Sequence, residues 1–274
     1  MSTRQKIGGI IALIGLFPLL VIVFIPAELV QGMVQRALAQ QGYTFTSGRF
    51  GKAFPLGISA SEVAIADSRG PLVKLDRLSV RPALIPLMTG NLALSADATV
   101  GSGTITALWS SGKSGEISAD ISGLRLEQVP FFQTVVGASA KGILRGEARL
   151  TGVAPRMNGF IKLEVRGAEL SDLKIGEMPL PAVSDETIQG ILRVKDGRGR
   201  VESLTFEGSG LYARLSGEVP LSASAPLDLI MELMPKADFL EKQKFVFLLL
   251  VKYLDSPGHY RIPVRGTLAK PSVF

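Results

Sequence analysis

The chain has 274 residues, of which 46% are hydrophobic and 20% are charged, with 30 glycines and a formal net charge of +6 at pH 7. It contains no cysteine and one histidine, which excludes disulfide bonds and thiol nucleophiles and leaves too few ligands for a typical zinc site. The cations form no basic run with interleaved aromatic residues, so the sequence gives no support for nucleic-acid binding.

The segment 7–25 carries no charged side chain. As a helix it would reach about 28 Å, the thickness of a bilayer's hydrocarbon core. It is longer than the apolar part of a signal peptide, and the residues after it make a poor cleavage site. We therefore predict a cytoplasmic leader at 1–6 and an uncleaved transmembrane helix at 7–25. Arg4 and Lys6 precede this segment and Glu28 follows it. This charge order predicts a single-pass protein of the cell inner membrane with a periplasmic C-terminal domain.

The next segment, 26–41, has the spacing of an amphipathic helix. Gly42 is a plausible end of this helix. The apolar residues that recur on one helical face are Leu29, Val30, Met33, Val34, Ala37 and Leu38. We predict a membrane-proximal helix here. It either packs on the first strands or lies flat in the headgroup region.

Beyond residue 42 the sequence alternates between apolar and polar residues, which is typical of β-strands. The alternation is clearest in the segments 92–99, 117–122, 161–166 and 211–219. Period two places the apolar side chains on one face of a sheet and the polar ones on the other, as in antiparallel sheets. Asp196-Gly197 lies between two such segments and predicts a hairpin turn. The region 42–274 is thus expected to be a mainly β periplasmic domain.

Three segments interrupt the strand pattern. Residues 130–136 predict one or two helical turns, and 237–254 predict a longer helix. The longer helix either plugs the end of a sheet or touches a membrane or a partner, because its apolar run is too short to span a bilayer. The proline-containing segment 176–185 is the best internal linker, and it divides the domain into possible lobes at 42–175 and 186–274.

Three local matches to catalytic or cofactor motifs fail on structural context. His259 follows a Pro-Gly turn, where neighbouring residues rarely aim at one another as a catalytic triad requires. Residues 208–213 match a dinucleotide fingerprint by letters but enter a strand, and 110–113 lie in a Gly/Ser-rich turn. We predict no catalytic, cofactor-binding or metal-binding residue, and expect that the protein is not an enzyme.

The sequence of residues 260–271, YRIPVRGTLAKP, resembles the closing strand of the type II secretion system protein N (GspN) family. The membrane helix, the amphipathic helix ending at Gly42 and the segment 54–58 are similar as well. The same features resemble the wider AsmA-like group. This resemblance implies a long curved antiparallel β-sheet beyond an inner-membrane anchor, with one or two short helices. It also implies a non-enzymatic accessory of protein export without cofactors.

Two functions follow as expectations. In the first, the β domain docks on other type II secretion components through a sheet edge or the loops near 130–136 and 176–185. In the second, an incompletely covered apolar sheet face carries the acyl chains of phospholipid or lipopolysaccharide. The predicted lipid-trough residues are Ile161, Leu163, Val165, Leu211, Ala213 and Leu215. The alternative for these six residues is an ordinary core, covered by an opposing sheet or a helix.

Overall fold

The computed structural model describes residues 26–53, 56–83, 91–111, 115–153, 156–172, 174–175, 178–179, 183–208, 210–220, 226–267 and 270–272. The predicted leader and transmembrane helix, 1–25, lie outside these residues. Within the described part of the chain, no helix combines the length and the apolar character needed to cross a membrane.

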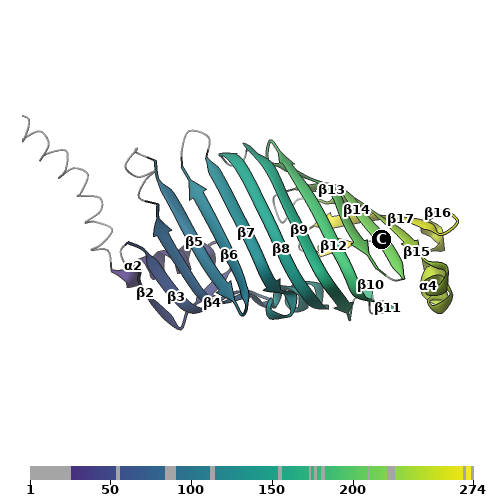
Figure 1. The fold of residues 1–274 in the computed structure, drawn as a ribbon, viewed down its shortest axis with the longest axis horizontal. Helices are drawn as coiled ribbons and strands as arrows, with labels where there is room; N and C mark the ends of the chain where they lie inside the picture. Colours follow the sequence, from purple (N-terminus) through teal and green to yellow (C-terminus); the bar gives the residue numbers. More distant parts are fainter. Residues whose placement is uncertain are drawn as a thin grey trace, which may run out of the picture.

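The described residues form one antiparallel sheet of 16 strands (Figure 1). The strand order is β1-β3-β4-β5-β6-β7-β8-β9-β12-β13-β14-β15-β17-β16, with β2 paired to β3 and β18 paired to β17. Most strands pair with their neighbours in the sequence, so short turns suffice to connect them. The mainly β, antiparallel fold class is confirmed.

The strands vary in length from two to 16 residues. In the described chain they are β1 (Thr44–Thr46), β2 (Arg49–Lys52), β3 (Ile58–Asp67), β4 (Gly70–Pro82), β5 (Ala93–Val100), β6 (Gly103–Ser110), β7 (Glu116–Arg125), β8 (Ser139–Val153), β9 (Arg156–Ser171), β10 (Lys174–Ile175), β11 (Met178–Pro179), β12 (Val183–Lys195), β13 (Arg198–Glu207), β14 (Leu211–Pro220), β15 (Asp228–Pro235), β16 (Leu254–Ser256), β17 (His259–Thr267) and β18 (Lys270–Ser272). Strands β10 and β11 pair only with each other.

The helical segments are short and lie where the sequence interrupts its alternation. They are α2 (Ala27–Ala39), η1 (Leu126–Gln128), η2 (Phe132–Val136), α4 (Ala237–Lys242), α5 (Lys244–Leu249) and η3 (Val251–Tyr253). The predicted amphipathic helix is present as α2, and the predicted turns at 130–136 are present as the single π-helical segment η2. The predicted helix 237–254 is divided, because Gln243 leaves helical geometry between α4 and α5.

The predicted hairpin at Asp196-Gly197 is confirmed. Strand β12 ends at Lys195 and β13 begins at Arg198, and both turn residues have positive φ, at 49° and 76°. Two positive φ values are typical of the type I′ turn, whose twist matches that of the flanking strands.

The sheet continues across the predicted linker 176–185. Strands β9 and β12 lie on either side of it and pair directly, with Ile188 opposite Val165. The division into two lobes therefore stays a prediction about folding units, within one continuous sheet.

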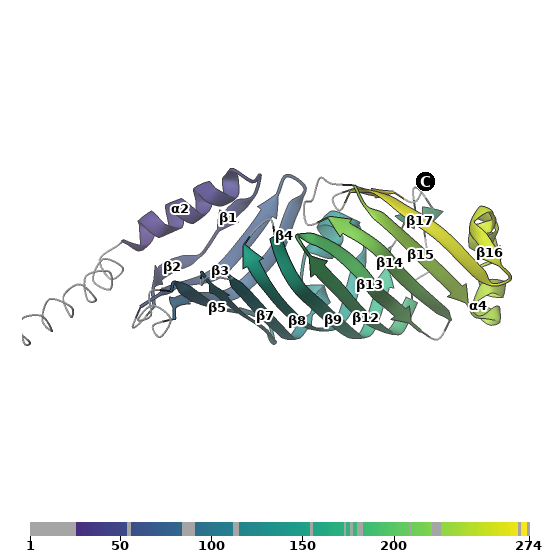
Figure 2. The same cartoon turned by 90° about the horizontal axis from the view of Figure 1, so that it is seen from above.

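The sheet has one apolar face and one polar face, and short helical segments pack on the apolar face. Helix α2 contributes Val34 and Leu38 to a buried cluster around Val63 at one end of the sheet. Segments η1 and η2 contribute Leu126 and Phe132 to a second cluster. Figure 2 shows the sheet curving along its length from β2 to β17, with α4 at the end opposite to α2.

The third buried cluster lies at that far end. There Phe247 of α5 and Leu250, which lies between α5 and η3, pack against Tyr260 and Ile262 of β17. Among the described residues, Ile262 and Val63 are the only large side chains less than 2% exposed. The described core is therefore a set of separate patches under helices and not the continuous layer between two sheets that a sandwich would have.

Candidate functional site

Strand register aligns apolar side chains into rows that run across the sheet. Residues directly opposite one another on neighbouring strands point to the same face. The first row crosses thirteen strands, and it contains Phe50, Ala60, Leu78, Ala98, Ile105, Ile121, Gly146, Leu163, Gly190, Leu204, Leu215, Met231 and Ile262. At about 4.8 Å between strands, its twelve spacings cover roughly 58 Å.

Two further rows flank the first on the same face. The second row contains Ile58, Val80, Ala96, Ala107, Ala119, Ala148, Ile161, Leu192, Val201, Gly217, Leu229 and Val264. The third row contains Leu124, Leu144, Val165, Ile188, Phe206, Ala213, Leu233 and Tyr260. No member of the three rows is charged, so the apolar face runs through the sheet without a polar interruption.

The helical segments cover these rows unequally. The third row lies under them almost throughout, because Leu124, Leu144, Ile188 and Leu233 all belong to or pack against the buried clusters. The middle of the first and second rows lies outside the three clusters. Six half-buried residues define this central apolar patch: Ile161, Leu163, Leu192, Val201, Leu204 and Leu215.

All six predicted trough residues lie on the apolar face, but the helices divide them into two sets. Val165 is buried among Leu126, Ala140 and Ala168. Leu211 and Ala213 pack against the cluster that α5 completes. Ile161, Leu163 and Leu215 belong to the central apolar patch. Two of the six therefore lie beside a helical cover, one lies in a buried cluster, and three lie on the patch.

Glycines leave the patch with an uneven surface. A methyl group built on Gly146 would lie 3.5 Å from Ile121 Cδ1, which is an ordinary contact. A methyl group built on Gly190 would lie 2.8 Å from Leu204 Cδ1 and 3.1 Å from Leu163 Cγ. The two leucines therefore lean over Gly190, whereas a Cβ at Gly146 would fit without displacing its neighbours.

The opposite face of the same strands carries ionic ladders. Arg193 Nε donates a 2.6 Å hydrogen bond to Glu202 Oε1 across the β12–β13 hairpin, and a second bond of 3.2 Å makes the pair bidentate. This hydrogen bonding lowers the pKa of the Glu202 carboxyl. Arg149 makes two bonds of 3.1 Å to Asp120 in the same way. Exposed ion pairs of this kind keep a face solvated and add little stability.

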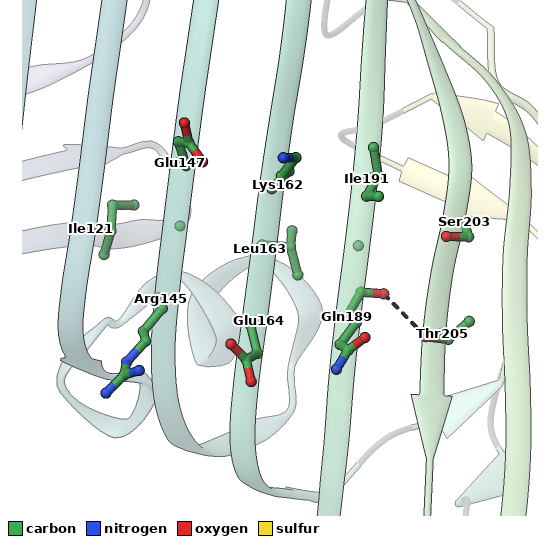
Figure 3. Close-up of a pocket in the computed structure, with 12 residues that line it drawn as sticks. Ile121, Arg145, Glu147, Lys162, Leu163, Glu164, Gln189, Ile191, Ser203 and Thr205 are labelled. Atoms are coloured by element: carbon green, nitrogen blue, oxygen red, sulfur yellow. Dashed lines mark hydrogen bonds between the residues drawn. The ribbon is translucent and has the colours of Figure 1, made fainter.

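A shallow pocket of about 460 Å³ lies over the middle of the sheet (Figure 3). Its polar lining comes from two rows of directly opposed residues, in which Arg145 faces Glu164 and Glu147 faces Lys162. Neighbours along a strand point to opposite faces, so these charged side chains lie on the face opposite Leu163. Each cation is matched by a carboxylate, as expected for a solvated sheet face and not for a binding site selective for one charge.

The rejected motifs occupy the contexts that the sequence predicts, where the structure describes them. His259 Nδ1 lies 3.3 Å from Asp255 Oδ2 beside a turn, and residues 211–213 open strand β14. Residues 112 and 113 of the third motif lie outside the described chain. Across the described ranges, no three His, Asp or Glu side chains gather in an arrangement suited to a metal ion.

The sequence reading missed Leu192, Val201 and Leu204. Leu204 and Val201 are separated by a β-bulge, visible as a register shift between Val201 and Leu204 in the pairing of β13 with β14. The bulge adds one residue and breaks the period of two, so strict alternation would place Val201 and Leu204 on opposite faces of the sheet. These residues are identified by their places in the cross-strand rows, and the rows can be drawn only when the strand register is known.

Comparison with known proteins identifies no relative for this arrangement. The chain matches no family model, no curated protein and no solved structure.

Proposed function

We propose that this protein is a non-enzymatic lipid-binding protein, anchored in the inner membrane, that holds acyl chains of phospholipid or lipopolysaccharide on its central apolar patch. The observation that carries this proposal is the continuity of the apolar rows through the patch, where no buried cluster includes Ile161, Leu163 or Leu215. Each methylene removed from water contributes about 0.8 kcal/mol, so an acyl chain can bind without a specific polar contact.

Two features of the face suit a flexible chain. The part of the first row outside the buried clusters, from Gly146 to Leu215, crosses four strand spacings and is about 19 Å long, so an extended acyl chain can lie across it. The patch has no charged member, and the ionic ladders lie on the other face. A headgroup would therefore remain at the margin of the sheet while the chain lies across the strands.

Photocrosslinking tests this function in cells with the full chain. Benzoylphenylalanine replaces Leu163 or Leu215 on the patch, or Lys162 or Arg214, which are their neighbours on the polar face of the same strands. We expect phospholipid or lipopolysaccharide adducts from 163 and 215, and none from 162 and 214. Equal yields from both faces, or no lipid adduct from any position, would contradict the proposal.

Docking to type II secretion components is the second candidate function. It is supported by the resemblance of residues 260–271 and by Phe131, which is 41% exposed while Phe132 beside it packs into a buried cluster. Phe131 lies in one of the two segments predicted to dock. The terminal strands β1 and β16 each have three residues, so the sheet edges offer little length for pairing with a partner strand.

The same crosslinking strains separate the two functions. Benzoylphenylalanine at 131 is expected to yield protein adducts if docking occurs, and mass spectrometry identifies the captured chain. Adducts of 131 with secretion components, together with no lipid at 163 or 215, would favour docking over lipid binding. Lipid at 163 and 215 with no protein at 131 would favour the lipid function alone.

A further inference from the structure

The helices at the far end of the sheet have two dissimilar sides. On the inner side, the Phe247 ring lies 5.2 Å from the Tyr260 ring and 6.2 Å from the Phe239 ring, measured between centroids. This side seals the end of the apolar face. On the outer side, Leu248 is 66% exposed and Val251 is 55% exposed. Both apolar side chains therefore face solvent on the side of the segment away from the sheet.

The outer side also carries a characteristic charge pattern. Lys244 and Lys252 are exposed and flank Leu248 and Val251 in the sequence. The side chains at 244, 248, 251 and 252 are all exposed, whereas Phe247 and Leu250 in the same segment are buried against the sheet. The segment 244–253 contains no acidic residue. The nearest acidic residues along the sequence are Glu241, in α4, and Asp255, whose carboxylate lies 3.3 Å from His259 Nδ1.

An apolar centre flanked by lysines matches the surface of an anionic bilayer. Apolar side chains enter the boundary between headgroups and acyl chains, while lysines remain at the phosphate level. Each basic residue near such a surface contributes further attraction. A protein partner of the same size would more often meet aromatic residues and arginine at the centre of the surface.

The position of this surface in the fold is distinct from that of the membrane-proximal helix. Figures 1 and 2 show α4 at one end of the sheet and α2 at the other. The apolar rows run between these two ends. A lipid surface at the α5–η3 end would therefore be a second contact, separate from the predicted anchor.

We propose that the outer side of α5 and η3, formed by Lys244, Leu248, Val251 and Lys252, is a docking surface for an anionic lipid bilayer. This inference does not depend on lipid binding by the central apolar patch, because it rests on the opposite side of the helices from the residues that seal the sheet.

The absence of cysteine allows a direct test on the full chain. A single cysteine replaces Val251 and carries a nitrobenzoxadiazole dye, and the control places the same dye at Leu108, an exposed residue on the polar face of β6. The labelled protein is reconstituted in phosphatidylcholine vesicles, and second vesicles of phosphatidylcholine or phosphatidylglycerol are added. We expect the dye at 251, and not at 108, to brighten only with phosphatidylglycerol and to be quenched by nitroxide lipid in the added vesicles.

Charge reversal supplies the second measurement. The double variant Lys244→Glu/Lys252→Glu should weaken the response at 251 by roughly thirtyfold in apparent affinity. The control Lys74→Glu/Lys195→Glu changes the net charge equally on exposed strand positions and should leave the affinity within about twofold of the original. Circular dichroism verifies folding, and Lys244→Gln/Lys252→Gln replaces the reversal if it disturbs α5. No response at 251, equal responses to both lipids, or equal effects of both charge reversals would overturn the proposal.

Discussion

The hydroxyl of Thr134 donates a 2.6 Å hydrogen bond to the backbone carbonyl of Pro71, 63 positions earlier in the chain. Thr134 belongs to η2, in the connection between β7 and β8, and Pro71 is the second residue of β4. Strands β4 and β8 are four places apart in the sheet. The η1–η2 segment therefore ties two distant strands together and covers the third apolar row beneath it.

Replacing Thr134 with valine removes this hydrogen bond while keeping the side-chain shape. We expect the free energy of unfolding to fall by about 1 kcal/mol, the usual net value of one such bond. Amide hydrogen exchange should accelerate in 132–138 more than in β12. Thr106→Val, on the polar face of β6, is the control and should leave exchange in 132–138 unchanged. An identical exchange pattern in both variants would show that the bond to Pro71 does not hold the segment.

The difference between Val165 and Leu163 predicts opposite responses to a charge. Val165 is buried under η1, so Val165→Asp places an unpaired carboxylate in an apolar site and should cost about 3 kcal/mol or more. Leu163 lies on the central apolar patch, where water can reach an aspartate. Leu163→Asp and Leu215→Asp should therefore cost about 1 kcal/mol or less.

Urea unfolding measures these losses of stability, and lipid extraction from the purified protein measures how much lipid each variant retains. Leu163→Asp should abolish lipid retention in a protein that stays folded. Unfolding of Leu163→Asp to the extent seen with Val165→Asp would mean that the patch is covered core.

Gly146 and Gly190 lie on the same row but differ in the space above them. Gly146→Leu should fold with little loss of stability, because its Cβ would make an ordinary contact with Ile121. The added side chain would occupy the open surface and lower the yield of lipid crosslinks from position 163. Gly190→Leu drives its Cβ into Leu204 and Leu163, and should cost about 1–3 kcal/mol by overpacking.

Thermal unfolding of the two variants, with crosslinking at 163 in the Gly146→Leu background, checks this prediction. Unchanged crosslinking at 163 in a stable Gly146→Leu protein would place the bound chain elsewhere on the sheet.

The Arg193–Glu202 pair predicts a pH-dependent contribution to stability. Hydrogen bonds from Arg193 lower the folded-state pKa of Glu202 from its ordinary value of 4.5. The pair therefore stabilises the fold above that ordinary pKa, and its contribution is lost as the pH falls through the lowered value. Both side chains reach solvent, so the effect is small.

The measurement compares Arg193→Gln with the original chain in denaturant unfolding from pH 7 to pH 3. The stability difference between them should be present at neutral pH and should shrink below about pH 4.5. Arg81→Gln, an exposed control on β4, should show no comparable trend. A difference that grows toward acidic pH would contradict the role assigned to Glu202.

Several local features were predictable because they arise from neighbouring residues alone. The alternation of Ile161, Leu163 and Val165 with charged residues fixes one apolar face for β9, since side chains alternate along any strand. The Asp196-Gly197 turn and the amphipathic spacing of α2 are equally local. The apolar run at 237–254 predicts a helix, but its interruption at Gln243 follows from packing both α4 and α5 against the end of the sheet.

The sequence by itself determined that this chain alternates, turns and buries one side of its strands, because period and turn chemistry belong to a few adjacent residues. Only the tertiary structure decided which part of the apolar face is covered. Val165 and Leu163 each lie between two charged residues and follow the same period, yet η1 and η2 fold back over the first and leave the second outside the buried clusters. The alignment of Leu163 with Gly190, Leu204 and Leu215 likewise depends on strand register and on a bulge in β13, which are properties of paired strands.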